Sequence, residues 1–437
     1  MSAPSGKPII GIDLLPAAVE AVSLYVHIPF CSSRCNYCDF YFETTRSPRV
    51  IQATLERILE EAEFLLSAMG RPTLRSVYFG GGTPSIVPPP LLDAFLSRFT
   101  AIVFQTPVLP GLEWTFEANP ESVDERLLEI LLRHGINRLS LGVQSFNDGL
   151  LQALTRRADG ERVRSALRAV KSVRRGVEQF GLNIDLITGI PRQTREQVRS
   201  DVKEAVDSGV DHFSVYSLTI EEHTPLKQAI DKKIRRLPTP SQQDGLWLCA
   251  RDAIQAAGFE WYEISNFARP GRRSQHNIGY WRLEPYLGVG PGGVSTIRVS
   301  EGNGTSARPV RLTNPNLFIY SSQFDRDWHH EVEELGPQAL LFEHFITGLR
   351  TSMGVSLGRL ERIFAVDLAE LWRERLDKWV SDGITARGAL RSDDPTLLLT
   401  PRARLALDHY LLEIESWIEA LPELPPPAWP LQGAGAS

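Results

Sequence analysis

The sequence predicts an α/β protein: an open, partial (β/α)6 barrel of the TIM-like type, followed by a mainly helical, winged-helix-like C-terminal domain. Two observations predict the barrel. Six or more strand-like and helix-like segments alternate from Ser23 onward, a pattern typical of parallel strands covered by helices. Each strand-like segment also ends in a polar residue or a glycine run. Since functional side chains of parallel barrels gather at that end of the strands, the pattern favours a barrel over a doubly wound sheet.

The barrel elements follow one another in regular order. Strands are expected over residues 23–28, 76–79, 112–118, 138–143, 182–187, 212–218 and 260–264. Apolar residues at helical spacing predict the intervening helices over residues 49–69, 90–103, 124–134, 160–179, 195–208 and 240–257. Glycines that follow several of these segments, such as Gly135 and Gly209, mark their C-terminal ends.

Changes in composition divide the chain into five predicted segments. Residues 1–22 form a loose leader, 23–265 the barrel, and 266–335 a connecting lobe of little periodicity. Residues 336–420 form the helical domain, with helices expected over 338–350, 357–364, 367–382 and 401–418. Residues 421–437 are rich in proline and glycine, which predicts a disordered tail.

The composition excludes several classes of protein. Of the 437 residues, 42% are hydrophobic and 23% charged, and the net charge of −6 gives no reason to expect a nucleic-acid partner. No apolar run approaches the ~18 residues of a membrane span, which leaves only peripheral membrane contact open. The N-terminal segment lacks the basic start and apolar core of a signal peptide. Four cysteines, three of them in one loop, indicate a reducing compartment, so we expect a cytoplasmic protein.

The cysteine loop follows the first predicted strand directly. Cys31, Cys35 and Cys38 have C-x3-C-x2-C spacing. Three thiolates can hold three irons of a [4Fe–4S] cluster and leave the fourth iron open to a ligand. Structural zinc is the alternative, but it takes four protein ligands. The remaining cysteine, Cys249, lies beside an apolar run and fits a buried core thiol.

Polar residues at the other strand ends suit a small zwitterion bound to an open iron. The carboxylates of Glu117 and Asp185 suit an ammonium group or ribose hydroxyls, and the planar guanidinium of Arg156 suits a carboxylate. Gln144 can bridge either kind of group, and Tyr37 offers a flat surface for an adenine ring. Each residue also has a structural alternative: a strand cap for Glu117, an internally paired strand residue for Asp185, and a solvated helix face for Arg156.

Taken together, the motifs resemble the radical S-adenosylmethionine (SAM) superfamily, and more finely its oxygen-independent coproporphyrinogen III oxidase-like family. The resemblance rests on segments 24–31, 79–85, 117–120, 142–146 and 183–186 together with the cysteine loop. It implies a radical SAM barrel with a [4Fe–4S] cluster whose open iron is chelated by SAM, and a reductant such as flavodoxin or ferredoxin. It also implies a SAM site formed by Tyr25, Gly81, Gly82, Thr83, Glu117, Gln144, Arg156 and Asp185.

Three features resemble the haem-chaperone (HemW-type) branch of that family more than the oxidase. Phe40 stands where the oxidase pattern has a further cysteine, the long N-terminal segment of the oxidase is missing, and residues 262–268 and 276–281 match chaperone motifs. The His-Asn-x-x-Tyr motif is associated there with haem, so the resemblance makes His276 a candidate axial ligand. The alternative is a loop histidine held by Asn277.

The branch resemblance implies a protein that binds haem and passes it to an apo-haemoprotein. Two enzymatic alternatives stay open: oxidative decarboxylation of coproporphyrinogen III, and a different radical reaction on another substrate. The sequence departs from the family pattern at Ala158, where a histidine is usual, and at Thr188 and Arg192. These departures leave the cluster and SAM assignments unchanged.

Overall fold

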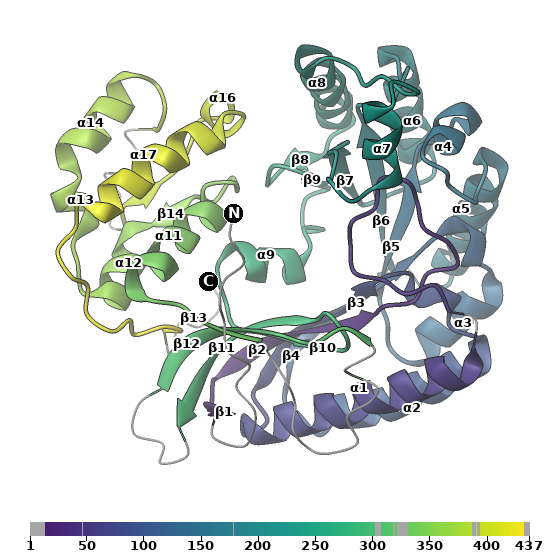
Figure 1. Ribbon diagram of the computed structural model, residues 1–437, viewed down its shortest axis with the longest axis horizontal. Coiled ribbons are helices and arrows are strands. Elements are labelled where there is room, and N and C mark those ends of the chain that lie inside the picture. The colour runs from purple at the N-terminus through teal and green to yellow at the C-terminus, as the bar shows by residue number, and fades with distance from the viewer. Residues whose placement is uncertain are drawn as a thin grey trace.

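The computed structural model describes residues 14–45, 47–177, 179–301, 307–317, 320, 331–386, 390 and 394–431. Six parallel strands form its centre and pair in sequence order. They are β2 (Ala21–Ile28), β3 (Thr73–Gly81), β4 (Val108–Ala118), β5 (Arg138–Gln144), β6 (Gly181–Thr188) and β7 (His212–Ser217). The sheet is curved and open, which confirms the predicted partial barrel (Figure 1).

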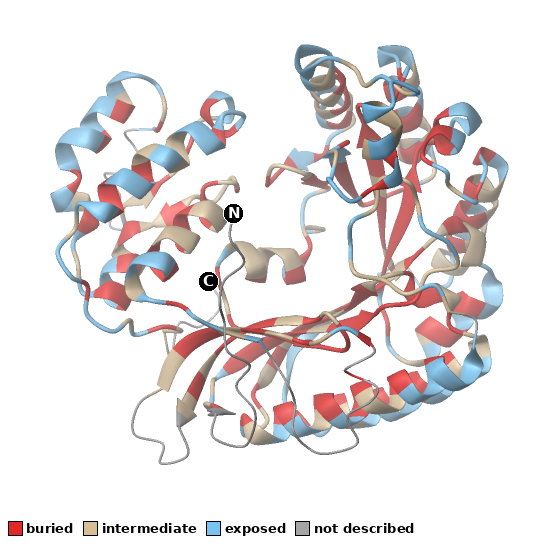
Figure 2. Ribbon diagram, viewed as in Figure 1, coloured by how far each residue is buried: buried red, intermediate tan, exposed pale blue. Residues whose placement is uncertain are grey.

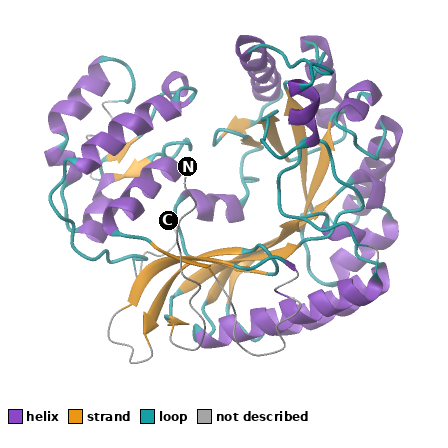
Figure 3. Cartoon of the chain, in the orientation of Figure 1, coloured by secondary structure: helices purple, strands orange, loops and turns teal. Residues whose placement is uncertain are grey.

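Helices follow the parallel strands; most cover the outer face of the sheet, while α4 and α7 pack at the strand ends beside the cysteine loop (Figure 3). They are α1 (Pro48–Ala68), α2 (Pro89–Val103), α3 (Glu125–Arg133), α4 (Asp148–Ala153), α5 (Gly160–Arg174), α6 (Arg195–Asp207), α7 (Pro225–Asp231) and α8 (Pro240–Ala256). Side chains satisfy the free amides at several starts: Asp124 accepts from Leu127 N, and Thr194 forms a capping box with Gln197. The buried residues concentrate on the strands and on the helix faces against them (Figure 2).

The segment expected as a connecting lobe extends this sheet at both edges. β9 (Asn266–Ala268) continues it beyond β7 and pairs with β8 (Glu260–Trp261), which lies within the last strand predicted for the barrel. On the other side β10 (Tyr286–Val289) pairs in parallel with β2, and β11 (Val294–Glu301), β12 (Ala307–Thr313), β13 (Glu331–Glu334) and β1 (Leu14–Pro16) follow antiparallel. The strand signal there has a period of two, with buried Ile297 and Val299 separated by Arg298.

The C-terminal region is mainly helical, as predicted, and lies across the opening from the barrel helices (Figure 1). Its elements are α11 (Pro337–Gly348), β14 (Val355–Ser356), α12 (Leu357–Phe364), α13 (Leu368–Leu371), α14 (Arg373–Ser381), β15 (Thr396–Leu397), α16 (Pro401–Arg404) and α17 (Leu407–Glu419). They enclose their own apolar core, in which Trp372, Trp379 and Trp417 pack together.

The two ends of the chain differ from their sequence-based descriptions. Residues 14–16 of the expected leader form β1, while 1–13 lie outside the described residues. The tail, expected to be disordered from residue 421, packs against the protein as far as 431: Trp429 is fully buried and donates from Nε1 to the Leu283 carbonyl at 2.8 Å. The large apolar tryptophan outweighs the surrounding prolines. No helix in the described ranges is both long and apolar enough for a bilayer crossing.

Candidate active site

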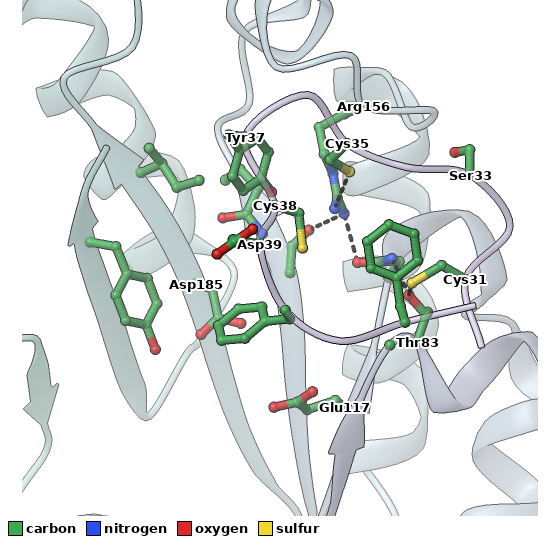
Figure 4. A pocket seen from close by; sticks show the side chains of 18 of the residues that line it. Cys31, Ser33, Cys35, Tyr37, Cys38, Asp39, Thr83, Glu117, Arg156 and Asp185 are labelled. Atoms are coloured by element: carbon green, nitrogen blue, oxygen red, sulfur yellow. Dashed lines mark hydrogen bonds between the residues drawn. The ribbon is translucent and has the colours of Figure 1, made fainter. Parts of the chain in front are cut away.

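A cavity of about 610 Å³ opens at the C-terminal ends of the parallel strands, beside the cysteine loop (Figure 4). It brings together most of the residues predicted for the cluster and SAM. Those that line it are Cys31, Cys35, Tyr37, Cys38, Gly81, Gly82, Thr83, Glu117, Gln144, Arg156 and Asp185. Tyr25 and His276 are not among its lining residues.

The cysteine loop is held in place by contacts at its start and at its middle. Next to its start, the Cys31 amide donates to the Glu43 carbonyl at 3.0 Å. At its middle, Asn36 donates from Nδ2 to the Ala153 carbonyl at the end of α4 (3.0 Å) and accepts from the Leu226 amide in α7 (2.8 Å). The loop is therefore supported by the barrel elements on the far side of the cavity.

The three thiols of the loop are free and partly exposed. Burial raises the pKa of the Cys31 thiol to about 11 and also raises that of Cys38, so both are neutral at pH 7. A metal that binds them must displace their protons. In the described part of the chain, no three His, Cys, Asp or Glu side chains are already grouped as a metal site. Three sulfurs from one short loop, facing one cavity, still fit a group that takes three protein thiolates.

Two glycines at the end of β3 let the backbone pass directly beneath the loop. Gly81 has φ +111°, and a Cβ atom there would lie 2.7 Å from the His27 ring. A Cβ atom on Gly82 would lie 2.6 Å from the Phe30 carbonyl oxygen. A side chain at Gly81 would displace the His27 ring, and one at Gly82 would displace the backbone that leads into the cysteines. The cavity floor is thus open backbone, suited to close approach by a ligand.

Arg156 is fixed across the ends of three strands. Its Nη2 donates to Asn119 Oδ1 (2.7 Å) and to the Gly142 carbonyl (2.8 Å), and its Nη1 lies 3.7 Å from Cys35 Sγ. Asn119 in turn donates to Thr83 Oγ1 at 2.9 Å. The guanidinium therefore faces the cavity, which contradicts the solvated-face alternative. Its buried Nε has no hydrogen-bond partner in the described part of the chain.

Sequence reasoning missed the supporting role of Asn119, although this residue stands in the same four-residue motif as Glu117. It also overlooked Tyr78, whose hydroxyl donates to Glu117 Oε1 at 2.6 Å. The sequence did not reveal this role of the Tyr78 hydroxyl, because a tyrosine within an apolar strand usually indicates a residue packed in the core.

Glu117 and Asp185 face the same cavity from β4 and β6. Burial raises the pKa of Glu117 to about 7 and raises that of Asp185. Asn183 donates to Asp185 Oδ1 at 2.8 Å. Because burial disfavours both charged carboxylates, a cationic group in the cavity would lower the free energy of their ionised forms. The pair is chemically suited to an ammonium or sulfonium group.

His276 and Tyr25 belong to an aromatic layer away from the cavity. His276 Nδ1 is 2.8 Å from Ser76 Oγ, and its ring stacks on Tyr78 with centroids 4.8 Å apart. Burial lowers the pKa of His276 to about 3, so the ring is neutral at pH 7. Its partner is Ser76 and not Asn277. The Tyr25 hydroxyl lies 3.2 Å from His27 Nδ1.

His276 stands near the start of α9 (Gln275–Trp281), whose N-terminus is capped by a residue of β4. Glu113 accepts from Ser274 Oγ (3.1 Å) and from the amides of Gln275 (2.9 Å) and His276 (3.0 Å). A carboxylate at a helix N-terminus is electrostatically favourable. The cap fixes His276 in the barrel interior, so a role as haem ligand remains a prediction that needs a rearrangement of α9.

Comparison with known proteins extends this picture over most of the chain. The Radical SAM superfamily profile matches residues 25–205. The "Heme chaperone HemW" of Lactococcus lactis is 32% identical over 82% of this chain and 89% of its own length. The mouse "Radical S-adenosyl methionine domain-containing protein 1, mitochondrial" is 34% identical over 78% of this chain and 75% of its own.

One solved structure resembles the fold throughout. It is the Escherichia coli coproporphyrinogen III oxidase HemN, with a TM-score of 0.70 over 92% of this chain and 91% of that one. The sequence identity is 22%, so this likeness bears on the fold alone.

Proposed function

Because this chain belongs to the radical SAM superfamily, in the HemN-like group that contains the HemW proteins, we propose that it is a HemW-type haem chaperone. Membership of the superfamily implies a [4Fe–4S] cluster and SAM. In this proposal the protein also binds haem and delivers it to an apo-haemoprotein in the cytoplasm. Flavodoxin or ferredoxin would serve as reductant.

The first cavity supports the cluster and SAM part of the proposal. Cys31, Cys35 and Cys38 would hold three irons, which leaves one iron for SAM. When bound, the cluster supplies one electron to SAM. Glu117 and Asp185 would orient the cationic part of SAM, and Arg156 its carboxylate.

The proposal of a chaperone role is supported by the relatives named as haem chaperones, which match this chain at 30–32% identity over 82–90% of its length. Phe40 adds to this argument. Its side chain is 77% exposed and lines the mouth of the first cavity, where the oxidase pattern has a cysteine. An exposed phenylalanine cannot replace a thiol as metal ligand or reactant.

The competing function is oxidative decarboxylation of coproporphyrinogen III, and one experiment separates the two. The cluster is reconstituted anaerobically, and the protein receives either haem or coproporphyrinogen III with SAM and a reductant. We expect haem binding and haem transfer to an apo-haemoprotein, without protoporphyrinogen. Formation of protoporphyrinogen at a catalytic rate, or a complete lack of haem binding, would overturn the proposal.

A further inference from the structure

A second cavity, of about 650 Å³, lies at the opposite ends of the strands from the cysteine loop. Its walls come from parts of the chain that are distant in sequence: the starts of β3 and β4, helices α9, α11 and α12, and the end of the tail. Figure 1 shows α9 between the sheet and the C-terminal helices. The cavity is therefore a joint product of the barrel and the helical region.

Helix α9 has two faces with different surroundings. His276 and Tyr280 pack into the aromatic layer of the barrel. Ile278 and Trp281, together with the following Arg282, line the second cavity. The His-Asn-x-x-Tyr-Trp segment, which the family resemblance associates with haem, thus forms one wall of this cavity, and its histidine is not part of that wall.

Four arginines line the second cavity, and three of them have no ion pair in the described part of the chain. Arg75 pairs with Glu284 at 2.7 Å. Within the described ranges, the side chain of Arg282 forms one hydrogen bond, from Nη2 to the Met353 sulfur at 3.8 Å. Neither Arg359 nor Arg362 forms a salt bridge within the described ranges, and Arg359 Nε is buried without a hydrogen-bond partner.

The acids of the second cavity are already engaged elsewhere. Glu284 pairs with Arg75, and Glu113 caps α9. Asp394 accepts from the hydroxyl of Ser356 at 2.7 Å. The lining still holds four arginines against these three acids, which leaves a surplus of positive charge. Burial is the main cause that lowers the pKa of Arg359; Glu284 opposes this effect, and neighbouring arginines add to it. Such a surplus favours an anionic ligand.

His344 provides an independent sign of a ligand. It lines the same cavity from α11, is only 6% exposed, and its Nε2 has no hydrogen-bond partner among the residues that the structure describes. Buried polar atoms without a partner are rare in native proteins and call for an explanation such as a bound molecule. Apolar side chains, among them Ile278, Trp281 and Leu360, complete the wall.

We propose that this second cavity, and not the cysteine cavity, binds haem, with the haem propionates at Arg282, Arg359 and Arg362. The inference rests on the proposed function, because it names the haem site of the chaperone. A guanidinium binds a carboxylate with paired hydrogen bonds, and the apolar part of the wall suits the flat face of an organic ligand.

Charge complementarity favours the second cavity over the first. Asp39, Glu117, Glu121, Asp185 and Glu221 line the cysteine cavity, against Arg156 and Arg157. These five acids and two cations would repel a ligand with two carboxylates and attract a cationic one such as SAM. In this arrangement the two cofactors occupy opposite ends of the barrel.

The test is a haem titration of the full-length, cluster-reconstituted protein, followed by the Soret absorbance. We expect Arg359→Glu combined with Arg362→Glu to weaken haem binding at least tenfold, while Arg126→Glu, an exposed arginine of α3 outside both cavities, leaves it unchanged. Haem dimethyl ester, which lacks the two charges, should bind the unaltered protein weakly and respond little to the arginine changes.

The outcomes separate the two proposals. If the unaltered protein binds no haem, the proposed function fails. If it binds haem, and neither the arginine changes nor esterification weakens binding, the site is wrong while the function stands. Haem displacement by an equal concentration of inorganic pyrophosphate would also overturn the inference, because the cavity would then be a phosphate site. Arg362→Glu alone, at an exposed position, provides a variant whose fold is not in question.

Discussion

The two cavities have similar volumes, about 610 and 650 Å³, but opposite excess charge. The first lies at the C-terminal ends of adjacent strands, and its polar groups hold one another: Arg156 with Asn119, and Glu117 with Tyr78. The second is assembled from the barrel, the C-terminal helices and the tail, and its arginines have few partners. The comparison teaches that the two ends of one barrel can carry opposite excess charge, one from side chains that already hold one another and one from side chains with few partners.

Replacing Cys35 by alanine should have the largest effect, because it removes one of three expected iron ligands. We expect loss of the cluster iron and of its absorbance in the first cavity, with haem binding at the second cavity retained. Iron content and haem titration measure the two. Cys249→Ala is the matched control, since Cys249 is buried in the core away from the loop. Full iron retention in Cys35→Ala would show that the ligand assignment is wrong.

Trp429→Ala should lower the free energy of unfolding, because Trp429 anchors the tail beside the second cavity. The side chain is fully buried and hydrogen-bonded to Leu283, and large-to-small changes of buried tryptophan cost about 3–5 kcal/mol in unfolding free energy. Denaturant unfolding measures this loss. Leu412→Ala, at an exposed position of α17, should change stability by less than about 0.5 kcal/mol. Equal effects of the two changes would mean that the tail does not support the second cavity.

Gly82→Ala should disturb the first cavity. The new methyl group would lie 2.6 Å from the Phe30 carbonyl oxygen, and overpacking of this kind typically costs about 1–3 kcal/mol. We expect weaker SAM binding in calorimetric titration as well as lower stability. Gly176→Ala is the control, because its nearest neighbour would be at an ordinary 3.7 Å. Unchanged SAM affinity in Gly82→Ala would argue that SAM does not approach this backbone.

Glu117→Gln should change stability in a way that depends on pH. Burial raises the pKa of Glu117 to about 7 in the folded protein, above the ordinary value of ~4.3 in the unfolded chain. The folded state therefore binds more protons between these values, so the contribution of Glu117 lowers stability as pH rises from about 4.5 to 7. We expect Glu117→Gln to be more stable than the unaltered protein at pH 8 and similar at pH 4, while binding SAM more weakly.

Unfolding by denaturant at the two pH values checks this last prediction. If Glu117→Gln and the unaltered protein differ in stability by the same amount at pH 4 and pH 8, burial does not raise the pKa of Glu117. Gain of stability together with loss of SAM affinity is the pattern of a functional group kept at a structural cost.

The sequence alone determined the alternating fold and the composition of the first cavity. Its groups stand at the ends of successive strands, and parallel pairing brings those ends together whatever the details of packing. The cysteine spacing, Gly81–Gly82, Glu117, Arg156 and Asp185 could therefore be predicted to meet. The sequence also predicted most helix ends, because capping residues and C-terminal glycines affect only the nearest turn of a helix.

Only the tertiary structure decided the rest. It joined strands β9 to β13 to the sheet, buried Trp429, and stacked the His276 ring on Tyr78, outside the lining of the cysteine cavity. It also brought together arginines that range from Arg75 to Arg362 along the chain. The spacing of apolar residues within one segment does not predict these contacts. They form between segments that are distant in sequence and bury apolar surface against each other.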